Sequence, residues 1–417
     1  MSSQGRKGLV PRLRFPEFGD MREWEETEIG NYLTESRVKG SGGDKAKKIT
    51  VKLWGNGVFE KNEALKGSSN TQYYRRKAGQ FIYSKLDFLN QAFGIVPAHL
   101  DGYESTVDLP CFDANEDIDV RFLLEYVQRK DFYKKYGEIA DGGRKAKRIQ
   151  VETFLNFPIY LPKIEEQLKI ADCLAAIDAL ITAQTQKRDA LKAHKKGLMQ
   201  QLFPAEGETQ PQLRFPEFRD TGDWEETTLG EVATFLKGKG VSKSDVSQHG
   251  SIPCIRYGEL YTCYDEIISS VISFTNVPSK DLILSKANDV IIPASGETQE
   301  DIATASCVLN GGIALGGDLN IIRTKINGIF LSYYLNNAKK KDISQLAQGI
   351  SVVHLYSSQL KNLNVNIPKQ EEQQKIADCL AAIDVLIATQ TEKIDALKTH
   401  KKGLMQQLFP AMEEVSA

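Results

Sequence analysis

A long segment of this chain occurs twice. Residues 162–204 and 368–410 form two blocks of 43 positions, and 35 of these positions are identical. A second duplication precedes each block, because the hexapeptide LRFPEF stands at residues 13–18 and again at 213–218, and WEET follows each copy. The stretch between each hexapeptide and its block shows little similarity to its counterpart. A repeated framework with dissimilar inserts predicts one architecture that presents two different surfaces.

Each repeated block has the pattern of a long amphipathic helix. Pro162 and Pro368 begin the blocks, glutamates follow these prolines, and Pro204 and Pro410 end the blocks, which are typical helix boundary signals. Apolar residues recur at alternating steps of four and three, the heptad spacing of a coiled-coil seam. A helix of about 39 residues is about 58 Å long. The residues predicted to form the seams, and with them the spacer and partner helices, are Ile170, Leu174, Ile177, Ile181, Gln184, Leu191, Leu198, Ile376, Leu380, Ile383, Ile387, Gln390, Leu397 and Leu404.

Gln184 and Gln390 lie near the middle of the two seams. A polar layer at this point predicts a fixed register at some cost in stability. We expect the two helices to pair with each other in antiparallel fashion, since the stretch between them is long enough for the chain to return. Such pairing would place the two dissimilar regions at opposite ends of a rod. The alternative is that each helix docks on its own domain or on the helices of a partner.

The two dissimilar regions predict two α+β domains of the same fold. In both, strand-like runs (81–88 and 94–100 in the first) precede a helix, predicted at 119–136 and at 329–341. A loop and a strand then lead into the long helix. The predicted fold class is therefore α+β, with two similar domains separated by a pair of long antiparallel coiled-coil helices in a pseudo-two-fold repeat. The predicted boundaries are 1–160 for the N-terminal domain, 161–205 for the first long helix, 206–366 for the C-terminal domain and 367–417 for the second long helix and tail.

The overall charge argues against binding of nucleic acid by bulk electrostatics alone, because the net charge is −2 and the pI about 6.3. Local polar or basic surfaces could still bind nucleic acid. A loop with glycine beside polar or basic residues follows the short helix of each domain, at 138–150 and 345–359. Glycine lets backbone approach a partner closely, and Arg, Lys, Gln, His and Ser contact base edges or phosphates. The candidate DNA-binding residues are Tyr74, Arg75, Arg76, Tyr83, Lys85, Gly143, Arg144, Lys145, Arg148, Gln348, Gly349, Ser351 and His354.

Two alternatives stay open for these candidates. Any one of the side chains could simply be solvated at the surface. The loop at 142–148 is also more basic than base reading requires, so that it could contact phosphates instead. The prediction of a nucleic-acid surface depends on the recurrence of such residues in both domains.

Signatures of catalysis are missing from the sequence. There is no GxxxxGK[ST] phosphate loop, and Gly238 and Gly240 supply only GKG in place of a complete GxGxxG. HExxH, GxSxG and the Asn/Asp-Pro-Pro-aromatic tetrapeptide of amino-methyltransferases are also missing. None of the six cysteines forms a CxxC pair, so we expect no structural metal and a reduced, cytoplasmic protein. We find no signal peptide pattern and no run of 18 apolar residues, and expect no membrane segment.

The arrangement of hexapeptide, variable region and P-x-x-x-E-Q-x-K-I-A-x-x-L-x-x-I-D helix, repeated once, closely resembles the specificity (S) subunit of type I restriction–modification systems. The segment Gly79 to Ser105 also resembles a sequence common in the target recognition domains of that family. The resemblance extends from Leu13 to Pro410, and duplication at two fixed places makes it specific. The matching residues are Pro162, Glu166, Gln167, Lys169, Ile170, Ala171, Leu174, Ile177 and Asp178, which recur at Pro368, Glu372, Gln373, Lys375, Ile376, Ala377, Leu380, Ile383 and Asp384.

This resemblance implies a subunit without catalytic activity of its own. Each variable region would be a target recognition domain for one half of a split sequence in double-stranded DNA. The helices would act as a spacer and dock two adenine methyltransferase (M) subunits, and two further restriction (R) subunits would translocate and cleave DNA. S-adenosylmethionine, ATP and Mg²⁺ would serve those partners and not this chain. Two other classes remain as alternatives, a coiled-coil scaffold whose domains bind proteins and a stand-alone DNA enzyme.

Overall fold

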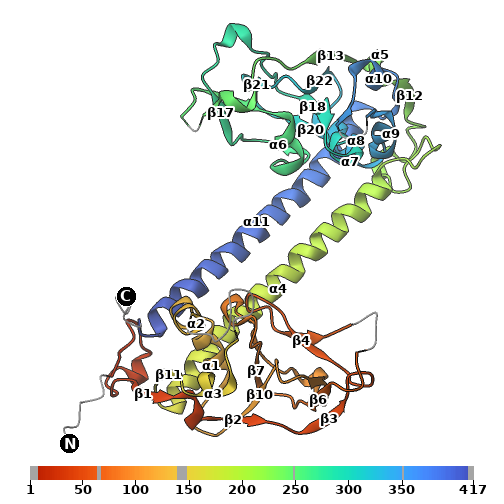
Figure 1. The fold of residues 1–417 in the computed structure, drawn as a ribbon. Coiled ribbons are helices and arrows are strands. Elements are labelled where there is room, and N and C mark those ends of the chain that lie inside the picture. Colours follow the sequence, from red (N-terminus) through yellow and green to blue (C-terminus); the bar gives the residue numbers. More distant parts are fainter. Residues whose placement is uncertain (1–7, 63–66, 139–147, 248, 350–351, 412–417) are drawn as a thin grey trace, which may run out of the picture. The chain divides into compact units, whose positions relative to one another are not determined.

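The computed structural model describes residues 8–62, 67–138, 148–247, 249–349 and 352–411. Two compact units divide the chain, one made of Met1–Ala183 with Lys393–Ala417 and the other of Gln184–Glu392. The division passes through both long helices, α4 (Ile164–Leu202) and α11 (Gln370–Leu408), which are drawn in yellow-green and in blue in Figure 1. Each unit therefore contains one α+β domain, the beginning of one long helix and the end of the other.

The N-terminal unit is built from small antiparallel sheets covered by short helices. Its largest sheet has the strand order β2-β10-β7-β8, beside a three-stranded sheet β3-β6-β9, a hairpin β4-β5 and the pair β1-β11. The strands are β1 (Glu25–Glu28), β2 (Leu33–Ser36), β3 (Lys39–Gly42), β4 (Ile49–Val51), β5 (Val58–Glu60), β6 (Gln72–Arg75), β7 (Phe81–Tyr83), β8 (Phe93–Ile95), β9 (Glu104–Ser105), β10 (Cys111–Ala114) and β11 (Pro158–Leu161). The helices are α1 (Val120–Val127), α2 (Lys130–Gly137) and α3 (Val151–Leu155).

Aromatic rings fill the core of this unit. The ring of Tyr83 lies 4.6 Å from that of Phe154 and stacks on Phe112 at 5.9 Å, measured between centroids. Such rings contribute large buried apolar areas and a preferred mutual geometry. Strand β7 carries this core because all three of its residues are buried.

The C-terminal unit has larger, mixed sheets. A five-stranded sheet has the order β13-β22-β18-β20-β16, a four-stranded sheet the order β14-β17-β15-β21, and β12-β24 and β19-β23 form pairs. The strands are β12 (Glu225–Thr228), β13 (Ala233–Lys237), β14 (Val246–Ser247), β15 (Ile252–Ile255), β16 (Ile267–Ile268), β17 (Ser273–Thr275), β18 (Asp289–Pro293), β19 (Ser295–Gly296), β20 (Ser306–Val308), β21 (Ala314–Leu315), β22 (Leu319–Thr324), β23 (Val353–His354) and β24 (Asn364–Ile367). The helices are α5 (Leu229–Val232), α6 (Tyr257–Thr262), α7 (Gln299–Ile302), α8 (Gly328–Asn337), α9 (Lys340–Leu346) and α10 (Ser357–Lys361).

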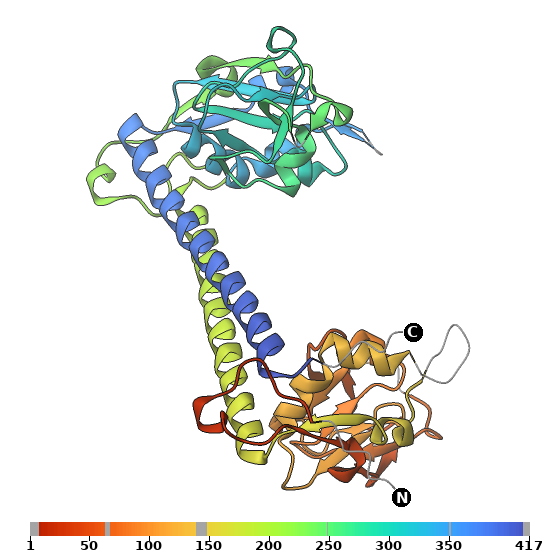
Figure 2. The same ribbon diagram turned by 90° about the vertical axis from the view of Figure 1, so that its left-hand side faces the viewer.

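The predicted α+β class and the two long helices are confirmed, and within each unit the helices run antiparallel, as can be followed in Figures 1 and 2. In the N-terminal unit, Ile170 and Leu174 share one hydrophobic core with Leu408, and Asp178 lies 2.7 Å from the ammonium of Lys401. In the C-terminal unit, Leu202 shares a core with Ile376 and Leu380. The amides of Gln390 and Gln184 are hydrogen-bonded, so the predicted polar layer exists.

Two helices predicted as continuous are broken. The run at 119–136 forms α1 and α2, and the run at 329–341 forms α8 and the start of α9. At the first break Arg129 takes an extended conformation with ψ of 138°, and its guanidinium donates to the carbonyl of Pro410 at 2.7 Å. The strand predictions were also too long, since β7 ends at Tyr83 and β8 at Ile95, and short 3-10 helices follow both. Long-range contacts of this kind override local periodicity.

Candidate nucleic-acid interface

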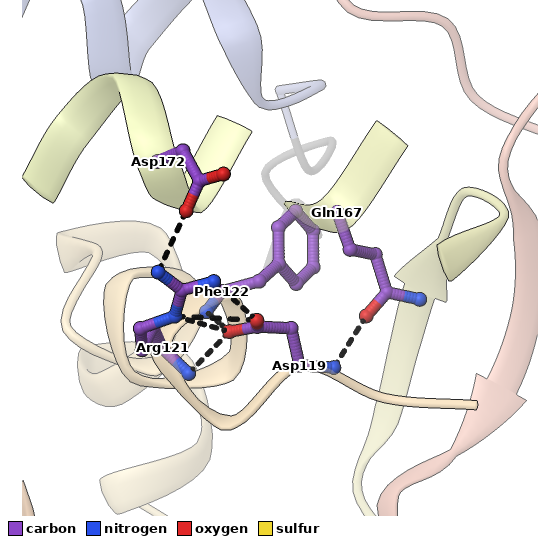
Figure 3. A network of polar contacts seen from close by, with 5 residues as sticks. All are labelled: Asp119, Arg121, Phe122, Gln167 and Asp172. Atoms are coloured by element: carbon purple, nitrogen blue, oxygen red, sulfur yellow. Dashed lines mark hydrogen bonds and ion pairs between the residues drawn. The ribbon is translucent and has the colours of Figure 1, made fainter. Parts of the chain in front are cut away.

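A glutamine of the repeated block anchors a short helix of each domain to the beginning of a long helix. Figure 3 shows this network in the N-terminal unit. Gln167 accepts the backbone N–H of Asp119 at 3.0 Å and donates to the carbonyl of Pro162 at 3.0 Å. Asp119 in turn caps α1 by accepting the backbone N–H groups of Arg121 and Phe122. Arg121 lies between Asp119 and Asp172 of α4 and is 2.7 Å from each carboxylate.

The C-terminal unit repeats this anchor with a different capping residue. Gln373 accepts the backbone N–H of Asn327 at 2.9 Å and donates to the carbonyl of Pro368 at 2.8 Å. Asn327 caps α8 through its own side chain. The repeated block thus holds two dissimilar domains by the same hydrogen bonds.

The repeated hexapeptide is held by a paired arginine and glutamate in each unit. Arg14 donates twice to Glu166, at 2.8 and 2.7 Å, and Arg214 donates twice to Glu372, at 2.8 Å for both bonds. The carboxylates are buried, and the hydrogen bonds to them raise the pKa of Arg14 and of Arg214. A bidentate pair of this kind is strongly directional, so it fixes the hexapeptide against the first turn of the long helix.

The end of the other long helix completes each unit. Phe409 packs against Trp24 with centroids 6.1 Å apart, and Phe203 packs against Trp224 at 6.5 Å. Both tryptophans are buried. The hexapeptide and the WEET segment of each domain therefore contact the beginning of one long helix and the end of the other, which explains why these segments and the helices are duplicated together.

The candidate surface of the C-terminal domain is a short hairpin that follows α9. Gln348 and His354 exchange two backbone hydrogen bonds, at 2.9 and 2.7 Å, and Gly349 has a φ of +127° that favours glycine. The Nδ1 of His354 lies 3.2 Å from the hydroxyl of Ser295 on β19, and its ring stacks on Tyr356. Val352 and Tyr356 are more than half exposed, and Ser351 lies outside the described residues. The structure brings the predicted Gln348, Gly349 and His354 together on one exposed element.

The candidate DNA-binding residues of the N-terminal domain differ in how exposed they are. Arg75 is exposed, Tyr74 and Lys85 are half-buried, and Arg148 lies 3.5 Å from Asp108 with 42% of its side chain exposed. These four side chains remain candidates for DNA contact. The predicted Gly143, Arg144 and Lys145 lie outside the described residues.

Two candidates of the N-terminal domain have internal roles and correct the prediction. Arg76 is 2% exposed, donates to the hydroxyl of Ser105 and the carbonyl of Ser36 at 2.8 Å each, and burial lowers its pKa. Tyr83 is fully buried, donates to the carbonyl of Ile149 at 3.0 Å, and burial raises its pKa. Neither side chain offers a polar atom to a partner, because buried polar groups of this kind are already hydrogen-bonded.

A pocket in the C-terminal domain was missed by the sequence reasoning. Its volume is about 600 Å³, and Gly240, Gly258, Gly316 and Gly317 line it together with Arg256. The Nε atom of Arg256 is buried and has no hydrogen-bond partner among the described residues, while its Nη2 donates to Glu259 at 3.1 Å. Lys243, Asp245 and Asp318 also line the pocket, so its charge is mixed. Glycine backbone beside the guanidinium of Arg256 suits an anionic group such as a phosphate at that end of the pocket. The only signal in the sequence was the incomplete glycine motif at 238–240.

The described residues show neither a metal site nor a membrane-crossing helix. They contain no group of three or more His, Cys, Asp or Glu side chains that could hold a metal ion. Within the same part of the chain, no helix combines the length and apolar character needed to cross a membrane.

Comparison with known proteins identifies the family. Residues 22–193 and 221–399 match the type I restriction modification DNA specificity domain. The chain is similar to the type I restriction enzyme MjaVIII specificity subunit of Methanocaldococcus jannaschii, with 24% identity over 95% of this chain and 93% of that protein. It is also similar to the putative MjaX specificity subunit of the same organism, with 26% identity over 69% of this chain and 66% of that protein.

A solved structure shares the fold. The type I restriction–modification system S subunit from M. genitalium matches with a TM-score of 0.55 and 14% identity, over 97% of this chain and 100% of that chain. The two ranges that match the family cover most of the sequence. The chain therefore belongs to the family of type I restriction–modification DNA specificity domains, and it carries two copies of that domain.

Proposed function

We propose that each domain reads one half of an asymmetric, bipartite DNA site, and that the long helices set the distance between the two halves. One observation carries this proposal. Gln167 and Gln373 hold two domains in the same way, yet the domains differ in sheet order and in surface. Two dissimilar readers on one repeated support recognise two different half-sites, whereas two identical readers would recognise a symmetric sequence.

The surfaces of both domains support contact with DNA. In the C-terminal domain, the hairpin with Gln348 and His354 offers amide, imidazole and exposed aromatic groups, which contact base edges. In the N-terminal domain, Arg75 and Arg148 offer guanidinium groups to phosphates or to guanine. The net charge of −2 is compatible with this proposal if partner subunits contribute basic surface.

The outer faces of the long helices provide the docking surface for adenine methyltransferase subunits in this proposal. Leu180 is 50% exposed, and its repeat equivalent Leu386 is 54% exposed beside Val385 at 64%. Exposed apolar groups mark a protein interface where they are contiguous, as Val385 and Leu386 are in the chain. An exposed leucine at the same repeat position in both units suggests two docking sites, and thus two M subunits in the complex.

The chemistry belongs to the partners in this proposal. The M subunits bind S-adenosylmethionine, flip the target adenine out of the duplex and methylate it. Restriction subunits, where present, use ATP and Mg²⁺ to translocate and cleave DNA. The chain itself supplies sequence recognition and assembly and no catalytic group, and we propose that it works in the cytoplasm.

A map of adenine methylation across a genome tests the proposal. The host would lack its own methyltransferases and would carry this chain together with its M subunit. We expect one split motif with a single fixed gap. No new methylation from a stable complex, or methylation without a split motif, would refute the proposal, and the first result would favour a protein-binding scaffold.

Variants assign the half-sites in the same assay. His354→Ala with Gln348→Ala should relax or abolish recognition of one half-site only. Arg148→Ala should affect the other half, with a smaller effect if it contacts phosphate. Equal loss on both halves from either variant would contradict two independent readers. Arg144→Ala with Lys145→Ala, predicted from the sequence, belongs to the same set as Arg148→Ala.

A further inference from the structure

One of the three tryptophans of the chain is exposed. Trp24 and Trp224 are buried at 0% and 2% exposure, whereas Trp54 is 60% exposed. Trp54 lies in the turn between β4 and β5, a hairpin drawn in orange-red in Figure 1. Leu53 beside it is 38% exposed, and Phe59 on β5 is 48% exposed. Leu53, Trp54 and Phe59 are thus three exposed apolar residues of one hairpin, and we call them the tryptophan edge.

The backbone at Trp54 is held in an unfavourable conformation. Its φ is +60°, and a bulky residue rarely occupies the left-handed region. Two backbone hydrogen bonds maintain it, from Trp54 N–H to the carbonyl of Asn90 at 2.7 Å and from Gly55 N–H to the carbonyl of Gln91 at 3.0 Å. Gln91 itself has a φ of +53°. Such strain persists where surrounding structure imposes it, and it is concentrated at functional sites.

The backbone of Trp54 is hydrogen-bonded to a segment that also contacts both flanks of the predicted recognition loop. Asn90 ends a short 3-10 helix that begins at Phe88, and Leu89 of this helix packs against Gly137, the last residue of α2. The loop leaves from α2, and at its far end Ile149 N–H donates to the carbonyl of Lys85 at 3.0 Å. The segment from Lys85 to Gln91 therefore carries both the ends of the loop and the anchor of Trp54.

We propose that Trp54 inserts into or stacks on the base stack of the half-site read by the N-terminal domain, a proposal that rests on the function proposed above. Aromatic and aliphatic groups offer no hydrogen bonds to base edges, but they act as wedges between base steps or as stacking platforms. Specificity then comes partly from how easily a base step opens, in addition to contacts with base edges.

The surroundings favour DNA over a protein partner. Residues 45–61 contain five lysines and one glutamate, and Lys45, Lys47, Lys52 and Lys61 are exposed. Basic side chains on the same chain segment as an exposed aromatic group are typical of surfaces that follow a phosphate backbone. The apolar edge consists of three side chains, whereas a stable protein interface buries about 800 Å² on each partner.

The test removes the ring without disturbing the fold. Trp54→Gly relieves the left-handed backbone, since glycine adopts this conformation readily, so a loss of binding cannot come from strain. Trp54→Phe keeps a smaller aromatic ring. Ile272→Ala, at a residue of the C-terminal domain that is 63% exposed, serves as the matched control for loss of an exposed apolar group. All variants are assembled with the M subunit, and binding to duplex DNA with the methylated motif is measured by fluorescence anisotropy.

We expect Trp54→Gly to weaken binding to the motif roughly 5- to 150-fold, the range for loss of one stacked base. Trp54→Phe should retain an intermediate affinity, and Ile272→Ala should leave recognition of this half-site unchanged. Weakened assembly with the M subunit together with normal DNA affinity of the assembled complex would overturn the proposal and assign the edge to a protein partner.

Unstacking is followed directly with 2-aminopurine placed at each step of this half-site, since its emission rises when it leaves the base stack. Wild type should give a signal at one step other than the methylated adenine, and Trp54→Gly should lose it while the signal of the flipped adenine persists. Unchanged binding and unchanged emission would refute the role of Trp54 while leaving the proposed function intact. If wild-type complex bound no DNA, the proposed function would fail as well.

Discussion

Replacement of Lys401 by methionine should destabilise the N-terminal unit in a manner that depends on pH. The ammonium of Lys401 lies 2.8 Å from Glu125 and 2.7 Å from Asp178, and its side chain is 18% exposed. Burial lowers the pKa of Lys401, but the charges of Glu125 and Asp178 outweigh this effect and raise it overall. Burial also raises the pKa of Glu125, and Lys401 counteracts this only in part. Glu125 is therefore the member of the cluster that depends most on the lysine.

The size of this loss of stability depends on the two carboxylates that lose the ammonium of Lys401 as a partner. Asp178 is 48% exposed and can be solvated, whereas Glu125 is 14% exposed and one of its oxygens is buried without a partner among the described residues. A buried charge without its partner costs about 3–5 kcal/mol. Glu125 can instead bind a proton, which costs about 1.36 kcal/mol for each pH unit above the ordinary pKa that glutamate has in the unfolded chain. We therefore expect Lys401→Met to reduce the free energy of unfolding by about 3 kcal/mol at pH 7 and by about 1 kcal/mol at pH 5.

The pH dependence of this loss of stability follows from the raised pKa of Glu125. A carboxyl whose pKa is raised in the folded state favours folding while it is protonated, and this contribution disappears as the pH rises through the folded pKa. Removal of Lys401 raises that pKa further, so the loss of stability should grow from pH 5 to pH 7. Lys401 itself stays protonated throughout this range, because its pKa is raised above the ordinary value for lysine.

The change in the free energy of unfolding is measured by chemical denaturation of the full chain at both pH values. A probe in the N-terminal unit monitors the unfolding. Lys401→Met with Glu125→Gln removes the buried charge and should recover most of the loss at both pH values. Lys195→Met is the matched control, because Lys195 occupies the same repeat position and pairs with Glu266 and Asp384 of the other unit. Glu266 is 19% exposed and, unlike Glu125, has no oxygen that is buried without a partner among the described residues, while Asp384 keeps the hydroxyl of Tyr333 as a donor. We therefore expect a smaller loss there, of about 1–2 kcal/mol. A loss independent of pH, or no recovery in the double variant, would refute the reasoning.

Three further predictions concern the seam, the spacer and the pocket. Gln184→Leu leaves the amide of Gln390, which is 5% exposed, without its acceptor and should cost about 1–3 kcal/mol in denaturation, whereas leucine at both positions should be nearly neutral. Insertion of seven residues at matched positions in α4 and α11 lengthens each helix by about 10 Å. The gap of the methylated motif should widen by about three base pairs, with both half-sequences unchanged. An unchanged gap would exclude the helices as the spacer. Arg256→Ala should weaken binding to all sequences alike and lower the salt dependence of binding by about one phosphate contact; a change of half-site preference would instead mean that Arg256 reads a base.

The repeat units and the long helices could be predicted because their signals are local and occur twice. Heptad spacing and boundary prolines act over a few residues, so the sequence predicts α4 and α11 within one or two residues of their ends. The two glutamines at the seam were also identified from spacing alone. Individual DNA-contacting residues were harder to predict, because residue type does not reveal whether a basic side chain faces solvent or the core.

By itself, the sequence determined that two dissimilar domains share one framework and that two long amphipathic helices belong to it, since both follow from duplication and periodicity. Only the tertiary structure decided the rest. It placed Arg76 in the interior, because its partners Ser36 and Ser105 are 40 and 29 residues away in the chain. It exposed Trp54 while the other tryptophans are buried, and the carbonyl groups of Asn90 and Gln91 fix the backbone of the turn that carries it. Such contacts join segments far apart in the chain, and their energies leave no periodic trace in the sequence.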